Sequence, residues 1–106
     1  MKTEAIEDRA HAALKYLTES DEQAADLKHE AEKAEHLYNA ACDAHFLAIE
    51  GSIEQRKAQA RNVCEPLYYD FLKAQRDYDA VANRRKSEAL AVDWCRSLYS
   101  NYRQGK

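Results

Sequence analysis

The stretch AIEGSIEQ, residues 48–55, contains the clearest helix boundary in the chain. Gly51 can adopt the left-handed backbone conformation that ends many helices. Ser52 and Gln55 have the spacing of a capping box, in which each side chain accepts a hydrogen bond from the backbone amide of the other residue. A glycine stop followed at once by a serine start predicts two helices joined by a tight turn. The stretch therefore predicts an antiparallel helical hairpin.

Both arms of this hairpin carry apolar or small residues at alternating steps of three and four. This spacing is that of a coiled-coil seam, and alanine in a seam lets the partner helix approach closely. In the first arm the seam residues are Leu27, Ala31, Ala34, Tyr38, Ala41, His45 and Ala48. In the second arm they are Ala60, Cys64, Leu67, Phe71, Ala74, Tyr78 and Val81.

An earlier helix precedes the hairpin, because Ser20 and Gln23 repeat the capping pattern. We expect this first helix to fold back against the pair. Pro66 lacks a backbone donor and clashes with the preceding turn, so the last helix should kink, or break, near residues 62–66. The predicted fold class is all-α, a single domain over 1–106 that forms a three-helix antiparallel hairpin or coiled coil with a long C-terminal helix. The expected helices cover about 4–18, 21–50 and 53–102.

The composition agrees with long helices in a reducing compartment. The 106 residues include only 2 Gly and 1 Pro, and straight-chain residues and alanine favour helices. No apolar run reaches the roughly 18 residues that a membrane span needs, and the N-terminal stretch carries acids where a signal peptide would be apolar. Three widely spaced cysteines suit reduced thiols. We expect a cytoplasmic protein of a bacterial cell, with no membrane partner.

Motifs of enzymes and metal sites are absent or incomplete. The stretch HEAEKAEH, residues 29–36, would need a second histidine at position 33 to be a zinc-protease motif, and Lys33 stands there. Cys42 and His45 would supply only two of the four ligands of a closed zinc site. Two glycines could scarcely build a phosphate-binding loop. The sequence therefore predicts a protein that is not an enzyme and has no metal or cofactor.

The C-terminal helix is the strongest candidate for a binding site. Its seam lapses at Arg85 and Glu88. Arg84, Arg85 and Lys86 form a basic cluster there, which would contact phosphate or acidic groups of a partner. Beyond them one apolar stripe continues the seam with Val92, Cys95, Tyr99 and Tyr102. A second stripe lies on another face, with Leu90, Trp94 and Leu98 at steps of four. A helix with two apolar faces usually contacts two bodies, and arginine with aromatic residues can bind nucleic acid or a protein. The candidate binding residues are Arg84, Arg85, Lys86, Trp94, Arg96, Leu98, Tyr99, Tyr102 and Arg103.

Charge is divided unevenly along the chain. Residues 1–50 contain 12 acids and 5 bases, whereas residues 51–106 contain 7 acids and 11 bases. The two halves can attract each other within one fold, or the basic half can face nucleic acid. An alanine-rich seam also buries little surface, so we expect self-association into a dimer or higher oligomer.

Three stretches, ALKYLTESDEQAADLK, FLAIEGSIEQRKAQA and ANRRKSEALAVDWCRSLYSNYRQG, resemble a family of small uncharacterised phage and prophage helical proteins. That family has a central EG(S/T)(V/I)xxRxAxA motif and a WRS-like C-terminal motif, and its members are often encoded near recombination or single-strand-annealing genes. This chain departs from the pattern at Cys95, which stands between Trp94 and Arg96, and at Tyr102, where paired arginines are expected. The resemblance implies a phage setting and leaves the activity open.

Together these observations favour a non-enzymatic phage accessory protein of DNA recombination or replication. It would bind nucleic acid or a recombination protein through the basic, aromatic C-terminal helix. An alternative is an inhibitor of a host defence or nuclease complex, acting by protein binding or by an acidic, DNA-like surface around Glu30, Glu32 and Glu35. A third is a structural helical oligomer without a dedicated site. The expected partners are a second copy of the chain, a phage or host DNA-processing protein and single-stranded DNA.

Overall fold

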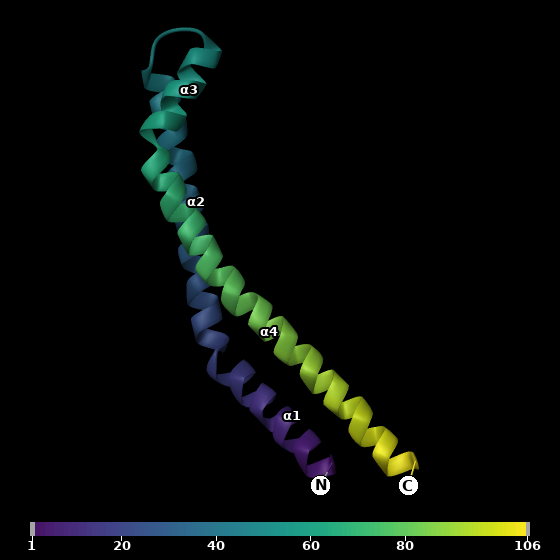
Figure 1. Cartoon of the computed structure of the whole chain (residues 1–106). Helices are drawn as coiled ribbons and strands as arrows, with labels where there is room; N and C mark the ends of the chain where they lie inside the picture. Colours follow the sequence, from purple (N-terminus) through teal and green to yellow (C-terminus); the bar gives the residue numbers. More distant parts are fainter. Residues whose placement is uncertain (1, 106) are drawn as a thin grey trace. The chain divides into compact units, whose positions relative to one another are not determined.

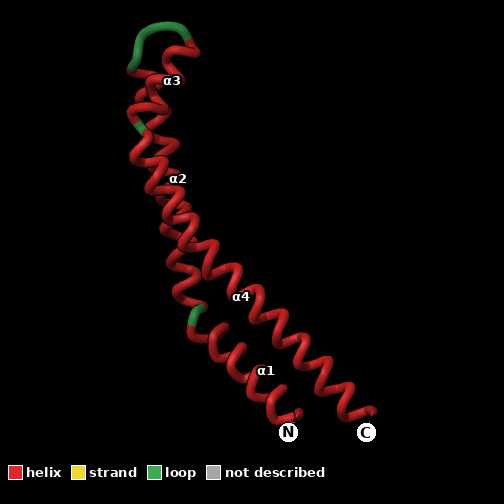
Figure 2. The backbone as a smooth tube through the Cα atoms, in the orientation of Figure 1, coloured by secondary structure: helices red, strands yellow, loops and turns green. Residues whose placement is uncertain are grey.

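The computed structural model describes residues 2–105, and over this range the protein is all-α, as the sequence predicted. The four helices are α1 (Lys2–Glu19), α2 (Asp21–Ala48), α3 (Ile53–Val63) and α4 (Glu65–Gly105) (Figure 1). Figure 2 shows the short breaks between them as green segments. Between residues 2 and 105 there is no strand, and no helix combines the length and apolar character needed to cross a membrane.

The turn between α2 and α3 forms as the sequence predicted. Gly51 has a φ of 127°, in the region that favours glycine. The Ser52 hydroxyl accepts a hydrogen bond from the Gln55 amide at 3.2 Å, and the Gln55 side chain accepts one from the Ser52 amide at 3.3 Å. This capping box satisfies two amides that the first turn of α3 cannot pair internally.

The sequence left open whether the last helix kinks or breaks near Pro66, and in the structure it is broken into two helices. α3 ends at Val63 and α4 begins at Glu65, so that Cys64 is the single residue between them. The Cys64 amide still donates to the Ala60 carbonyl at 3.0 Å, and the Tyr68 amide donates to the Cys64 carbonyl at 3.1 Å. Pro66 is the second residue of α4, where a missing amide costs nothing because first-turn amides have no partner within the helix.

The described chain divides into two compact units. Unit 2, residues 26–78, contains most of α2 together with α3 and the start of α4. Its core lies on the predicted seam, where Ala31, Ala60 and Cys64 are buried. Arg56 closes one end of this unit: its guanidinium donates to the Phe46 carbonyl at 3.0 and 2.8 Å and lies 4.3 Å from the centre of the Phe46 ring.

Unit 1 contains α1, the first residues of α2 and the C-terminal half of α4 from residue 79. Ala13, Ser20 and Cys95 are buried in it. We expected the first helix to fold back against a pair of helices. Within unit 1 its packing partner is instead the C-terminal half of α4 (Figure 1). Small residues such as Ala13 permit this two-helix packing, because they let the backbones approach closely.

Candidate functional site

The break between α1 and α2 determines the surroundings of the basic cluster of α4. Ser20 is the single residue between the two helices, and its amide still donates to the Tyr16 carbonyl at 2.9 Å. Ser20 is also buried. Carbonyl groups at the end of a helix need donors from outside that helix. A side chain of α4, which packs against α1 in unit 1, can supply such a donor to the C-terminus of α1.

Arg85 supplies that donor. Its Nη1 donates to the Leu17 carbonyl at 2.7 Å and to the Ser20 hydroxyl at 2.8 Å. Its Nη2 donates to a carboxylate oxygen of Asp21 at 3.2 Å. Only 24% of the Arg85 side chain is exposed. The planar guanidinium, with donors in a rigid fork, thus joins the end of α1 to the start of α2.

Glu88 is the second charged residue in the seam, and it also has a partner in α1. Arg9 Nη1 lies 2.7 Å from a Glu88 carboxylate oxygen. The Glu88 side chain is only 15% exposed, and its hydrogen bond raises the pKa of Arg9 above the ordinary value. The two charged residues that interrupt the apolar seam, Arg85 and Glu88, therefore both make polar contacts within unit 1. The sequence pattern alone missed this, because it does not show which residues of α1 lie opposite.

The other two cations of the basic cluster, Arg84 and Lys86, have different surroundings. The Arg84 guanidinium lies 3.9 Å from the centre of the Tyr16 ring, a cation–π contact with α1. Lys86 is exposed. Two of the three cations predicted to bind phosphate or acidic groups therefore contact α1 of unit 1. Of these, Arg84 remains exposed to solvent, whereas Arg85 is largely covered.

The outward face of α4 carries the second apolar stripe. Leu90 is 62% exposed and Trp94, one turn later, is 66% exposed. Their neighbours at alternating steps of three and four are exposed and uncharged, although 33% of the chain is charged. We call this set the outer strip; it consists of Asn83, Ser87, Leu90, Trp94, Ser97 and Asn101. A second heptad pattern of uncharged residues is a sequence signal that could have identified the whole strip.

The remaining residues of the two predicted stripes agree with the prediction only in part. Cys95 is buried and Tyr99 is half-buried, so both lie on the seam, as expected. Leu98, which was predicted on the second stripe, is half-buried, and Tyr102, which was predicted on the seam, is exposed. Two cations remain near the strip. Arg96 is exposed, with its guanidinium 3.9 Å from Asp93, and the guanidinium of Arg103 lies 6.0 Å from the centre of the Tyr99 ring.

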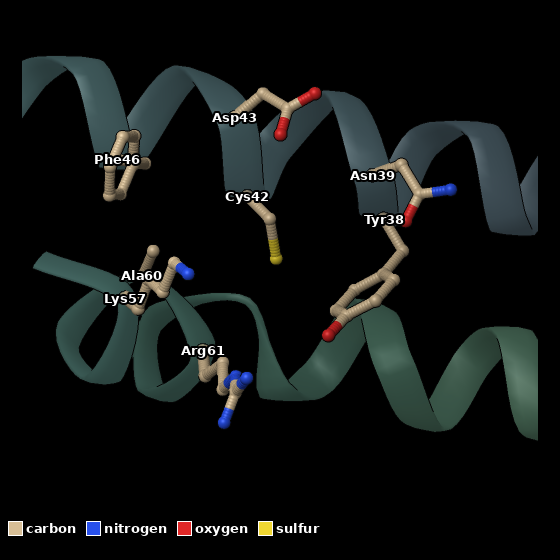
Figure 3. Close-up of a pocket in the computed structure, with 8 residues that line it drawn as sticks. All are labelled: Tyr38, Asn39, Cys42, Asp43, Phe46, Lys57, Ala60 and Arg61. Atoms are coloured by element: carbon tan, nitrogen blue, oxygen red, sulfur yellow. The ribbon is translucent and has the colours of Figure 1, made fainter. Parts of the chain in front are cut away.

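Unit 2 has a separate open groove of about 370 Å³ between α2 and α3. Figure 3 shows the Cys42 sulfur pointing from α2 toward the facing chain, with Tyr38 beside it. The groove is lined by Tyr38, Asn39, Cys42, Asp43, Phe46, Lys57, Ala60 and Arg61. Glu30, Glu32 and Glu35, the acidic residues of the alternative DNA-like surface, are all exposed on α2.

Comparisons with known proteins add no assignment. No protein-family model, curated protein or solved structure matches this chain. Within residues 2–105 there is also no group of three or more His, Cys, Asp or Glu side chains placed to hold a metal ion. The resemblance to the phage helical family stays a prediction, and a function has to be argued from the geometry of the two units.

Proposed function

We propose that this chain is a non-enzymatic binding protein that recognises a protein partner through the outer strip of α4. The exposure of Trp94 together with Leu90 carries the proposal. Tryptophan is the residue type most enriched among residues that dominate binding energy at protein interfaces. A solvated helix face normally carries charge, whereas the outer strip is uncharged along its length.

Anchors with this spacing fit one known mode of recognition. Leu90 and Trp94 are four residues apart and therefore lie above each other on one face of α4. An amphipathic helix can place such anchors in an apolar groove of its partner. Serine and asparagine at the remaining positions of the strip can donate and accept hydrogen bonds at the rim of an interface. The expected partner surface is thus apolar in its centre and polar around it.

The contacts of the basic cluster favour a protein partner over nucleic acid. A guanidinium that binds phosphate must be free to reach it, and Arg85 already donates to three groups of unit 1. Arg84 is stacked on Tyr16. Lys86, Arg96 and Arg103 remain exposed. These three are better suited to the rim of an interface, where arginine and lysine steer association.

The biological setting of the proposal rests on the phage resemblance. If it holds, the partner is a phage or host protein that processes DNA, such as a single-strand-annealing protein. Because the outer strip is uncharged, it lacks the charge that DNA mimicry needs, and we expect it to contact an apolar surface of that partner.

Titration of the dye-labelled chain with a purified single-strand-annealing protein and with the host single-strand-binding protein tests the proposal. We expect saturable binding to one of them, followed by fluorescence anisotropy. Replacing a central aromatic anchor typically costs 2 kcal/mol or more, so Trp94→Ala should weaken binding by about 30-fold. Leu47→Ala is the matched control, because Leu47 is also a large apolar residue, 76% exposed, and it lies in unit 2.

The other outcomes distinguish the alternatives. Binding to a single-stranded oligonucleotide that falls steeply with salt and is lost in Lys86→Ala/Arg96→Ala would replace the protein partner by DNA. Self-association that Trp94→Ala abolishes, with no binding to either protein, would indicate a structural oligomer. If Leu47→Ala weakens binding as much as Trp94→Ala, the outer strip is not the contact surface.

A further inference from the structure

The C-terminal half of α2 has an exposed face that carries almost no charge. Between residues 26 and 35, every exposed side chain of α2 except His29 is charged. Between residues 36 and 48, Asp43 is the only exposed residue that is charged. Because the solvated face of a helix normally carries charge, this change of composition indicates that the second half of α2 is a contact surface.

Four exposed residues at alternating steps of three and four form this face, and we call them the α2 strip: Leu37, Ala40, Ala44 and Leu47. Residues at this spacing lie on one side of a helix. Leu37 is 50% exposed and Leu47 is 76% exposed. The α2 strip lies in unit 2, whereas the outer strip of α4 lies in unit 1. An inference about the α2 strip is therefore independent of the proposed function.

The order of residues in the α2 strip is symmetric. Leu37 and Leu47 are equidistant from position 42, and so are Ala40 and Ala44. Two copies that are placed antiparallel about a twofold axis at this position bring leucine opposite leucine and alanine opposite alanine. A twofold contact needs such a pattern, because the same surface of both subunits has to be self-complementary. Alanine in the centre lets the two helices approach closely, and leucine covers both ends of the contact.

Charge selects the antiparallel arrangement over a parallel one. Lys33 continues the α2 strip one step before Leu37, and the corresponding position at the other end is Gly51, next to Glu50. In an antiparallel pair Lys33 of each copy therefore lies near Glu50 of the other, whereas a parallel pair would place lysine against lysine. Both residues are exposed, and the ion pairs of the described residues include neither of them.

Asp43 is the one charge that opposes the antiparallel contact. It lies beside the twofold position, so the two copies of this residue approach each other. Figure 3 shows its carboxylate pointing away from the facing chain. Lys57 and Arg61 line the same groove of unit 2 as Asp43, and these nearby cations reduce the repulsion between the two carboxylates. Two attractive pairs therefore outweigh one screened repulsion.

We propose that this chain forms an antiparallel homodimer through the α2 strip. The strip spans about 15 Å of helix, and a contact of that length buries less than the roughly 800 Å² per partner of a stable complex. The dimer is therefore weak and forms at chain concentrations of about 100 µM or above. At the nanomolar concentration of a dye-labelled chain it is dissociated, so that Leu47→Ala remains a valid control for the outer strip.

Sedimentation equilibrium of the folded full-length chain tests the proposal, at low ionic strength and from roughly 10 µM to 1 mM chain. Lys33→Glu and Glu50→Lys should each raise the Kd of the dimer about tenfold, because each turns two attractive pairs into repulsive ones. The double variant Lys33→Glu/Glu50→Lys keeps the net charge and restores both pairs, so its Kd should return to within about threefold of the wild-type value. The two positions lie about 25 Å apart along a helix, so this coupling arises between chains.

Three further variants complete the experiment, and circular dichroism establishes that each one is folded. Leu47→Asp should abolish the dimer, because it places a charge against Leu37 of the other copy. Lys28→Glu is the matched control for charge, since Lys28 is exposed on the same helix outside the α2 strip, and it should change the Kd by less than about twofold. Trp94→Ala should leave the dimer unchanged.

Four results would each overturn the proposal. One is a chain that stays monomeric up to the highest concentration. The second is a double variant that associates no more tightly than the single ones, since the antiparallel register would then be wrong. The third is a loss in Lys28→Glu as large as that in Lys33→Glu, which would show an effect of net charge alone. The last is a dimer that Trp94→Ala abolishes, which would move the contact to the outer strip of α4.

Discussion

The hydrogen bonds of Arg85 predict that one side chain holds α1 in place. The perturbation is Arg85→Ala, which removes the donors to the Leu17 carbonyl and the Ser20 hydroxyl. A hydrogen bond that involves a charged group contributes roughly 1.5 kcal/mol or more. The third contact, to the exposed Asp21 carboxylate, adds about 0.5 kcal/mol at most. The expected loss in the stability of α1 is therefore about 2 to 3 kcal/mol, since water can partly replace the lost donors.

Amide hydrogen exchange measures this loss locally. Each 1.4 kcal/mol is a factor of ten in an equilibrium constant, so amides of α1 should exchange about 30- to 150-fold faster in Arg85→Ala than in the wild type. The amides of α3, in unit 2, provide an internal reference. Arg85→Lys should lie between the two, because lysine keeps the charge but lacks the fork that reaches several acceptors.

Lys86→Ala is the matched control, since Lys86 is the neighbouring cation and is exposed. It should change α1 exchange by less than about threefold, as surface substitutions usually do. If Arg85→Ala changes the exchange rates of the α1 amides no more than Lys86→Ala does, Arg85 does not hold α1 in place. Arg85 would then be available to contact a binding partner, as the sequence predicted.

Three further predictions concern single positions. Gly51→Ala should destabilise the chain by about 1 to 2 kcal/mol in urea unfolding, because its φ is 127° and a Cβ there would lie 2.9 Å from the Gln55 side-chain oxygen; an unchanged midpoint would contradict the turn geometry. The raised pKa of Cys64 stabilises the fold fully below the unfolded thiol pKa of about 8.5 and progressively less as pH rises through the folded value, so Cys64→Ser should flatten the alkaline decline in stability. Trp94 in the free chain should emit at long wavelength and be quenched readily by acrylamide, whereas a blue-shifted, protected emission would show that its face is already covered.

Local features of the sequence predicted most of the helical architecture. The capping box at Ser52 and the positive φ of Gly51 depend only on neighbouring residues, and both formed as expected. The seam residues could also be predicted, because a heptad repeat indicates which side of a helix is covered, whichever helix covers it. The two alternatives for Pro66 remained open, since proline is accepted equally at a kink and in the first turn of a new helix.

The candidate site was only partly readable. Periodicity separated Cys95 and Tyr99 on the seam from Trp94 on the outer face, and the exposures agree with that division. Arg85 and Glu88 interrupt the apolar seam, and a charged residue in a seam predicts a surface that no neighbouring helix covers. We therefore expected a free basic surface at this point. In the structure Arg85 instead donates hydrogen bonds to Leu17 and Ser20, and Glu88 accepts one from Arg9.

The sequence by itself determined where helices start and stop and which of their sides are apolar, because capping and periodicity act over a few residues. The tertiary structure decided which helix lies opposite which, and with it the role of each charge. Arg85 and the Leu17 carbonyl are 68 positions apart, and no local rule relates them. Only the packing of α1 against α4 brings an unpaired carbonyl to a guanidinium, and so leaves Leu90 and Trp94 as the uncovered face of the helix.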